Sequence, residues 1–152
     1  MKSFMKYVGF PALILLVLIQ FLPIGKDHTN PPVLAEPMWD SQTTKQLFER
    51  ACADCHANTT KWPWYSNVAP ISWIIQEHVE DGRRHFNISA WGVQKRNEGN
   101  EAAEEVEKGE MPIFGYDITH PEAKLSTHEK EALIQGLKAT FGSKQEKEDD
   151  DD

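Results

Sequence analysis

Two cysteines and one histidine within five consecutive residues constrain this chain more than any other feature. Cys52, Cys55 and His56 stand in the stretch ACADCHAN, and the chain of 152 residues has no other cysteine. On a helical turn, residues three apart project from neighbouring points of one face. The fold must therefore present both thiols and the following imidazole on one side of a single turn.

The pattern Cys-x-x-Cys-His is the attachment motif of c-type haem. Two sulfurs with this spacing can reach the two vinyl groups on one edge of a porphyrin, and the next residue then lies under the iron. We therefore predict one haem c, attached covalently through Cys52 and Cys55, with His56 as the proximal iron ligand.

Three other interpretations of the cysteine pair stay open. A thioredoxin-like thiol pair has the same spacing, but it is flanked by alternating strands and helices, which this sequence does not predict. A zinc site would need four ligands, and one cysteine pair with scattered histidines is available. A structural disulfide would suit an exported domain but requires no adjacent histidine.

Residues 41–141 are predicted to form an all-α domain, because no run of residues alternates as in a strand. Thr43 with Gln46 can form a capping box that opens a first helix carrying the cysteines. A second helix is predicted to start at Pro70 and to end before Asn87. The fold class is therefore a small, cytochrome c-like helical domain.

Two more helices are predicted toward the C-terminus. A polar helix over about 94–108 would stop at Gly109, since glycine readily ends a helix. Ser126 and Glu129 form another capping box, and the helix after it runs to Phe141 with an apolar stripe on one side. This last helix is expected to pack against the first.

Residues 1–25 are predicted to be a membrane anchor or signal segment. Lys2 and Lys6 precede an apolar run from Tyr7 to Ile24, which as a transmembrane helix would reach about 27 Å, close to the thickness of a hydrocarbon core. The lysines predict a cytoplasmic N-terminus. We expect a single-pass protein of the cytoplasmic membrane with its domain on the periplasmic or extracellular side; a cleaved signal peptide is the alternative.

Two polar segments flank the predicted domain. Residues 26–40 are rich in proline and have no hydrophobic period, which is typical of a spacer. Residues 142–152 finish in four aspartates and predict a disordered acidic tail. The formal net charge of −8 argues against nucleic acid as a partner.

Met111 is the first candidate for the second axial iron ligand. It lies in the loop Gly-Glu-Met-Pro, where the proline stiffens the backbone and the glycine lets it turn. Filling a gap in the core is the commoner role of methionine. His78 and His85, seven apart on the predicted second helix, are alternative ligands. His120 and His128 are expected at the surface.

The order of these features resembles a monohaem class I cytochrome c. More narrowly, the stretches KWPWYS, APISW, NISAW and GEMP after the cysteine-histidine motif resemble the bacterial haem-binding domain family, over about Thr43 to Phe141. This family is a small group of exported or membrane-anchored proteins. The resemblance implies haem binding.

The aromatic residues of these stretches are expected to wall the haem, because a porphyrin is a large, flat, apolar body. They are Trp62, Trp64, Tyr65, Trp73 and Trp91; an ordinary core role is the alternative. Arg83 or Arg84 is a candidate partner for a haem propionate, since a guanidinium pairs well with a carboxylate.

These features predict a monohaem c-type cytochrome that exchanges single electrons with redox partner proteins at the outer face of the membrane. With His56 and Met111 both bound, the iron would have no open position, so we expect an electron carrier rather than an enzyme. The alternatives are a haem-based sensor or peroxidase-like enzyme with a displaceable sixth ligand, and a thiol oxidoreductase without haem.

Overall fold

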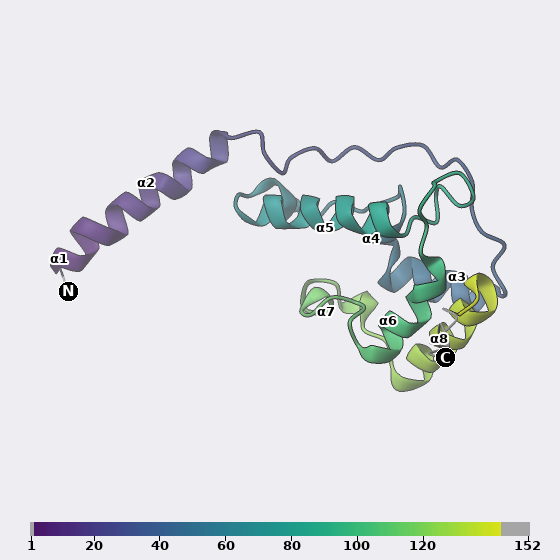
Figure 1. The fold of residues 1–152 in the computed structure, drawn as a ribbon. Helices are drawn as coiled ribbons and strands as arrows, with labels where there is room; N and C mark the ends of the chain where they lie inside the picture. The colour runs from purple at the N-terminus through teal and green to yellow at the C-terminus, as the bar shows by residue number, and fades with distance from the viewer. Residues whose placement is uncertain (1, 144–152) are drawn as a thin grey trace, which may run out of the picture.

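The computed structural model describes residues 2–143, and helices joined by loops account for their regular structure (Figure 1). Within this range the β-structure consists of one isolated bridge between Ala35 and Ala90. The all-α prediction is confirmed. Apart from its first two residues, the predicted acidic tail lies outside the described residues.

The domain is built from helices that follow one another through short turns. The longer helices are α3 (Gln42–Ala51), α5 (Ile71–His85), α6 (Ala102–Lys108) and α8 (Thr127–Phe141). The shorter pieces are α4 (Ala53–His56), α7 (Tyr116–Thr119) and the 3-10 turns η3 (Trp64–Asn67), η4 (Gly99–Glu101) and η5 (Pro121–Ala123).

Helices α3 and α8 cross at close range, as the sequence predicted for the first and last helices. Gly136 of α8 makes this approach possible, because a Cβ atom built there would lie 2.0 Å from the hydroxyl oxygen of Thr44 on α3. Phe48, Leu133 and Leu137 are almost fully buried at this crossing. The two helices therefore form one side of the hydrophobic core.

The predicted helix ends are right in two places and wrong in a third. Ser126 and Glu129 form the capping box at the start of α8, as expected. Helix α5 follows Pro70 and ends just before Phe86. The cap of α3 is Ser41, whose hydroxyl accepts a hydrogen bond from the Thr44 amide, so the Thr43 prediction was displaced by two residues.

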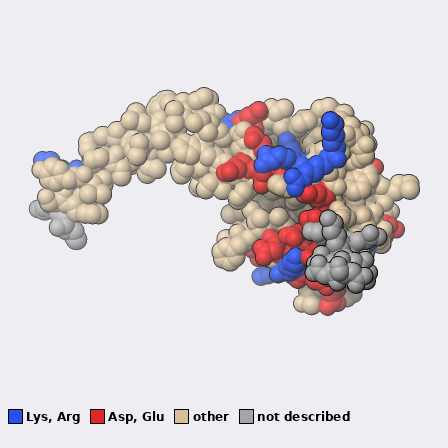
Figure 2. Space-filling model, in the orientation of Figure 1, with Lys and Arg blue, Asp and Glu red and all other residues tan. Residues whose placement is uncertain are grey.

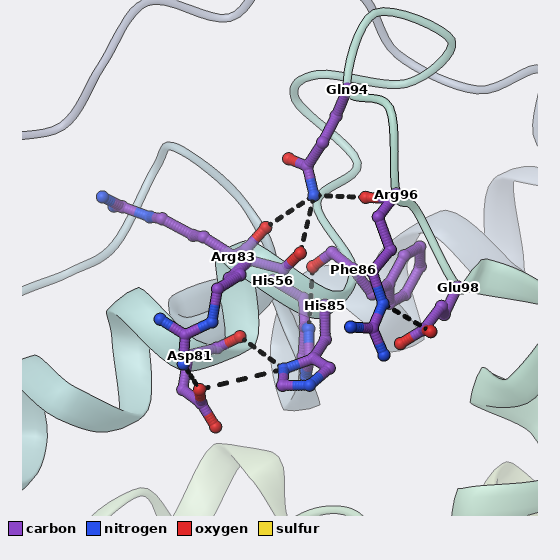
Figure 3. A network of polar contacts seen from close by, with 9 residues as sticks. His56, Asp81, Arg83, His85, Phe86, Gln94, Arg96 and Glu98 are labelled. Atoms are coloured by element: carbon purple, nitrogen blue, oxygen red, sulfur yellow. Dashed lines mark hydrogen bonds and ion pairs between the residues drawn. The ribbon is translucent and has the colours of Figure 1, made fainter.

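The third helix starts later than predicted because residues 94–98 form an irregular loop. The Gln94 side-chain amide donates to the backbone carbonyls of Arg83 and Arg84, at 3.1 and 2.9 Å, and Figure 3 shows it between these backbone segments. Asn97 exchanges hydrogen bonds with Asn87. These hydrogen bonds keep the segment in a non-helical conformation, and helical structure resumes at η4.

The N-terminal segment, residues 2–21, projects away from the domain and is called the arm (Figure 1). It comprises α1 (Lys2–Phe4), a π-helical turn (Met5–Gly9), α2 (Phe10–Leu18) and a 3-10 turn (Ile19–Phe21). No helix in residues 2–143 is long and apolar enough to cross a membrane, so the predicted transmembrane helix is not found. The helical segment ends before Leu22, which is extended, as expected for a residue that precedes a proline.

Residues 26–40, here called the strap, run along the domain in extended conformation. Ser89 accepts backbone hydrogen bonds from Leu34 and Ala35, at 2.8 and 3.2 Å. The His28 ring stacks on Trp62, with centroids 4.4 Å apart. Although its composition is that of a spacer, the strap is thus tied to the domain over much of its length.

Candidate functional site

A cavity of about 440 Å³ lies between α3, α5, α6 and the loop after α6. Its walls contain every predicted site residue: Cys52, Cys55, His56 and Met111. The alternative ligands His78 and His85 also line it, and apolar side chains such as Phe48, Phe86 and Val106 supply much of the remaining wall. The structure also describes His120 and His128, which lie outside this lining.

The two cysteines share one turn at the junction of α3 and α4. Cys52 ends α3, and its carbonyl accepts hydrogen bonds from the amides of Cys55 and His56, at 3.2 and 3.0 Å. Both thiols are free and half-buried, and both line the cavity. The turn, called the attachment turn below (residues 52–56), therefore presents the sulfurs and the imidazole to one space, as the spacing predicted.

His56 has the orientation and protonation state that a metal ligand needs. Its Nδ1 donates to the carbonyl of Phe86 at 2.9 Å, as Figure 3 shows, which leaves Nε2 as the nitrogen able to bind iron. Burial lowers the pKa of His56, although the carbonyl oxygens of Phe86 and Gly82 oppose this shift. The neutral ring favoured by burial is the form that coordinates metals.

Gly82 lets α5 pack directly on the attachment turn. A Cβ atom built on this glycine would lie 2.6 Å from the carbonyl oxygen of Cys55 and 3.0 Å from its Cβ. A glycine inside a helix costs stability and therefore indicates a packing requirement. The glycine within the predicted helix was thus a visible sign of close packing, and the structure shows that the packing partner is Cys55.

Buried polar contacts secure the residues that follow the attachment turn. The Asn58 amide donates to the Ser89 hydroxyl at 2.9 Å, and the Asn87 side chain donates to that of Asn58 at the same distance. Arg83 donates to the carbonyl of Ala57 at 3.0 Å and to the hydroxyl of Thr60 at 2.8 Å. These contacts fix the wall of the cavity that carries His56.

The predicted role of the arginines at a propionate does not match their contacts. The Arg83 guanidinium also donates to Thr29 and to the Asn30 side chain of the strap, at 3.2 and 2.8 Å. Arg84 forms an ion pair with Asp81. Arg83 thus joins the strap to the attachment turn, a role that requires contacts between distant segments of the sequence.

Met111 reaches the cavity from a turn that begins at the end of α6. Gly109 ends this helix in a left-handed conformation, with φ of 81°, which is the conformation that favours glycine. The Met111 amide then donates to the carbonyl of Glu105 at 3.1 Å. The side chain is half-buried against the hydrophobic core and lines the cavity.

Tyr116 connects the segment after Met111 to the attachment turn. Its hydroxyl donates to Asp54 at 2.7 Å, and Asp54 is one of the two residues between the cysteines. Burial and the adjacent Asp54 carboxylate both raise the pKa of Tyr116. Sequence reasoning missed this contact, because it joins residues 62 positions apart.

The prediction that five aromatic residues wall the haem was wrong. The structure describes all five, and none of them lines the cavity. Trp62 stacks on His28, Trp64 is largely exposed, and Trp91 packs against Phe86 and Phe141 in the core. The aromatic residues that face the cavity are Phe48, Phe86 and Tyr116.

The state of the cysteines disfavours thiol chemistry. Burial raises the pKa of Cys52 to about 12 and that of Cys55 to about 11. A thiol oxidoreductase needs a thiolate, which a low pKa supplies. Among the described residues, no group of three His, Cys, Asp or Glu side chains could hold a metal ion, so a zinc site built from these residue types finds no support in this region either.

The site fits a porphyrin in volume, wall chemistry and ligand set. Cofactor pockets commonly measure roughly 300–1,000 Å³ and have mostly apolar walls with a few placed polar groups. A family model for a haem-binding domain matches residues 14–139. The chain belongs to this haem-binding domain family. No curated protein and no solved structure matches the chain. The haem-binding domain match begins within the arm and includes the whole strap.

Proposed function

We propose that this haem-binding protein is a monohaem c-type cytochrome that exchanges single electrons. One observation carries the proposal: both cysteines, His56 and Met111 line the same apolar cavity. Each of these residue types has a defined role toward a covalently attached haem, and the chain contains no further cysteine for another role.

Different residues of the cavity would have different roles in binding the haem. Cys52 and Cys55 would anchor it through their sulfurs, and His56 would bind the iron through Nε2 while Phe86 keeps its Nδ1 proton in place. When bound, haem supplies one-electron redox chemistry, with a potential set by the axial ligands and by burial. The largely apolar walls would limit the access of water to the bound haem.

Met111 is the sixth ligand that the arrangement of the walls favours. A side chain from a wall other than the one that carries His56 would complete the coordination of the iron. Helix α5, which carries His78 and His85, packs on the attachment turn through Gly82, whereas Met111 comes from a separate turn after α6. A methionine ligand raises the reduction potential relative to a second histidine.

A second candidate is a haem-based sensor or peroxidase-like enzyme with a displaceable sixth ligand. It is favoured by the three side chains able to bind iron, Met111, His78 and His85, that share one cavity with His56. Carbon monoxide added to the reduced protein separates the two functions. Slow or absent binding supports the carrier, and fast binding supports the sensor or enzyme.

We further propose that the arm associates the protein with the cytoplasmic membrane and that the domain works at its outer face, with redox proteins there as partners. The proposal is motivated by the uncharged sequence from Tyr7 to Gly25 and by the lysines that precede it. Separation of cells into soluble and membrane fractions tests it. Recovery of the protein in a soluble cytoplasmic fraction would contradict it.

The haem proposal is tested by producing the full chain in cells that have the machinery for attaching haem c. We expect an intact mass that exceeds the polypeptide by one haem, and a pigment that denaturation does not release. The double variant Cys52→Ser with Cys55→Ser is the control, since it should have the bare polypeptide mass. A bare mass for the natural sequence would refute covalent attachment.

A further inference from the structure

The start of α5 and the turn before it expose a group of apolar side chains. This apolar face consists of Trp64, Val68, Ile71 and Ile74, which are 79%, 38%, 47% and 52% exposed. The sequence around them, residues 62–76, contains no charged residue. Contiguous exposed apolar surface of this kind marks an interaction site for a protein or a membrane.

The arm exposes apolar side chains on all sides. Residues 13–18 are consecutive apolar residues, and each of them is between 44% and 60% exposed. A stripe that packed on the domain would instead bury one side of the helix. Figure 2 shows the charged side chains gathered over the domain, while the surface of the arm is uncharged along most of its length. Its surface suits an apolar surrounding such as lipid.

The arm is fastened to the domain directly beside the apolar face. The Gln20 side chain donates to the carbonyl of Ala69 at 2.9 Å and accepts from the amide of Ala69 at 3.0 Å. Ala69 lies between Val68 and Ile71 of the face. These two bonds, called the clasp, use the one polar side chain in the interior of the apolar run.

A second contact holds the chain just after the clasp. Gly25 has φ of 71°, and a Cβ atom built on it would lie 2.6 Å from the backbone of Ser72 and Trp73. The Asp27 amide donates to the Gln76 side chain at 3.0 Å. The chain just after the arm therefore lies against the first turns of α5, beside the apolar face.

We propose that the apolar face rests on the surface of the lipid bilayer, with the clasp setting the orientation of the domain. The inference rests on the proposed membrane association of the arm. Tryptophan is enriched where a protein meets the interface between hydrocarbon and water, and Trp64 is the most exposed residue of the face. A bilayer would cover both the face and the arm, which the clasp holds side by side.

The orientation has a consequence for the haem cavity. Ile74 and His78 are one helical turn apart on α5, and His78 lines the cavity. The apolar face thus leads along one helix to a residue that lines the proposed haem site. With the face on the bilayer, this end of the cavity would lie near the membrane surface, within reach of a membrane-bound redox partner.

Photo-crosslinking to lipid tests the inference. The haem-loaded full chain is placed in vesicles of phosphatidylethanolamine and phosphatidylglycerol, with p-benzoylphenylalanine replacing Trp64 or Ile74 in turn. The same group at Leu15 reports on the arm. At Val93, exposed in the loop after the far end of α5, it serves as the control, because α5 separates the two ends by about 22 Å. We expect lipid adducts at positions 15, 64 and 74 and few at position 93.

Each outcome decides between the two proposals. Adducts at position 15 with none at 64 and 74 overturn the resting face but leave the membrane association of the arm. Absence of adducts at position 15 overturns both. Crosslinks from positions 64 and 74 to a second copy of the chain would identify the face as a dimer interface and overturn the bilayer contact.

The variant Gln20→Leu tests the clasp, because it removes both bonds at nearly constant volume. We expect it to lower the lipid adducts at positions 64 and 74 by about fivefold or more, since two hydrogen bonds are lost, and to leave those at position 15 unchanged. Unchanged adducts at all three positions would overturn the orienting role of Gln20.

Discussion

The two walls of the proposed haem cavity are held in different ways. The attachment wall, formed by the attachment turn and α5, is fixed by buried hydrogen bonds from His56, Asn58 and Arg83 and by the close approach at Gly82. The ligand wall, residues 109–120, is tied by the Met111 amide and by the Tyr116 hydroxyl. Its side chains Phe114 and Ile118 are exposed.

This difference suggests separate roles for the two walls: one would hold the attached haem, and the other would determine its sixth ligand. Segments with few buried contacts open at lower free energy than segments with many. The attachment wall would therefore keep His56, the proposed proximal ligand, in a fixed position, whereas the ligand wall would decide whether the proposed sixth position stays closed. Variants in each wall should have distinct signatures, which the following predictions use.

The largest effect is expected for Met111→Ala in the ligand wall. Loss of the thioether should abolish the weak long-wavelength sulfur-to-iron band of the oxidised protein. It should also lower the potential by on the order of 0.1 V, within the roughly 0.8 V range that axial ligands span. Visible spectra and a redox titration measure this. His78→Ala and His85→Ala are the matched controls, and loss of the band in either of them instead would move the ligand to that histidine.

Gly82→Ala should disturb the attachment wall. Overpacking against the Cys55 carbonyl should cost about 1–3 kcal/mol, which exceeds or offsets the roughly 1 kcal/mol by which alanine favours a helix over glycine. We expect a lower free energy of unfolding and a smaller fraction of chains with attached haem, measured by denaturation and intact mass. Glu77→Ala, at an exposed position of the same helix, should leave both nearly unchanged. A stabilised Gly82→Ala variant would contradict the tight contact.

Tyr116→Phe should loosen the ligand wall, because it removes the bond that ties this wall to Asp54 of the attachment turn. The variant removes a hydrogen bond to a carboxylate, worth about 1.5–3 kcal/mol, so added imidazole should compete with Met111 about tenfold more effectively or better. Spectral titration with imidazole measures this, and the haem content should stay constant. Phe114→Ala, in the same loop but fully exposed, is the control. Equal imidazole affinities for both variants would show that Tyr116 does not hold the loop.

The smallest effect is expected behind the attachment wall, where Glu129 of α8 pairs with Arg50 of α3 at 2.6 Å. The Ser126 amide and then Arg50 lower the pKa of Glu129 to about 2, below its ordinary value of 4.5. Ionised Glu129 thus stabilises the fold above about pH 4.5, and this contribution is lost as the pH falls toward 2. The Tm difference between the natural chain and Glu129→Gln should shrink over that window. A pH-independent difference would contradict the assignment.

The sequence alone predicted those features that depend on residues close together in the chain. The Cys-x-x-Cys-His spacing places Cys52, Cys55 and His56 on one turn whatever surrounds it, and the Ser126 capping box lies within four residues. Met111 could be proposed because Gly109 and Pro112 flank it closely. These local features predicted four of the residues that line the cavity, Cys52, Cys55, His56 and Met111, and the absence of strand alternation predicted the all-α class.

Long-range contacts could not be predicted in the same way. The Tyr116 contact to Asp54 and the Arg83 contacts to the strap join segments that are far apart in the chain. The aromatic block was assigned to the haem because aromatic residues suit both a porphyrin and any other apolar surface. Its position in the fold depends on long-range contacts, such as the stack of Trp62 on His28 and the contact of Trp91 with Phe141.

The docked strap limits how far the cofactor can travel. A flexible linker of this length would allow the domain to occupy many positions relative to the arm, because the end-to-end distance of a flexible chain increases with its length. Hydrogen bonds from Arg83 to the strap and from the amides of Leu34 and Ala35 to the Ser89 carbonyl, together with the stack of His28 on Trp62, reduce that freedom. In the proposed setting this protein would work as a stationary relay, and mobile partners would have to come to it.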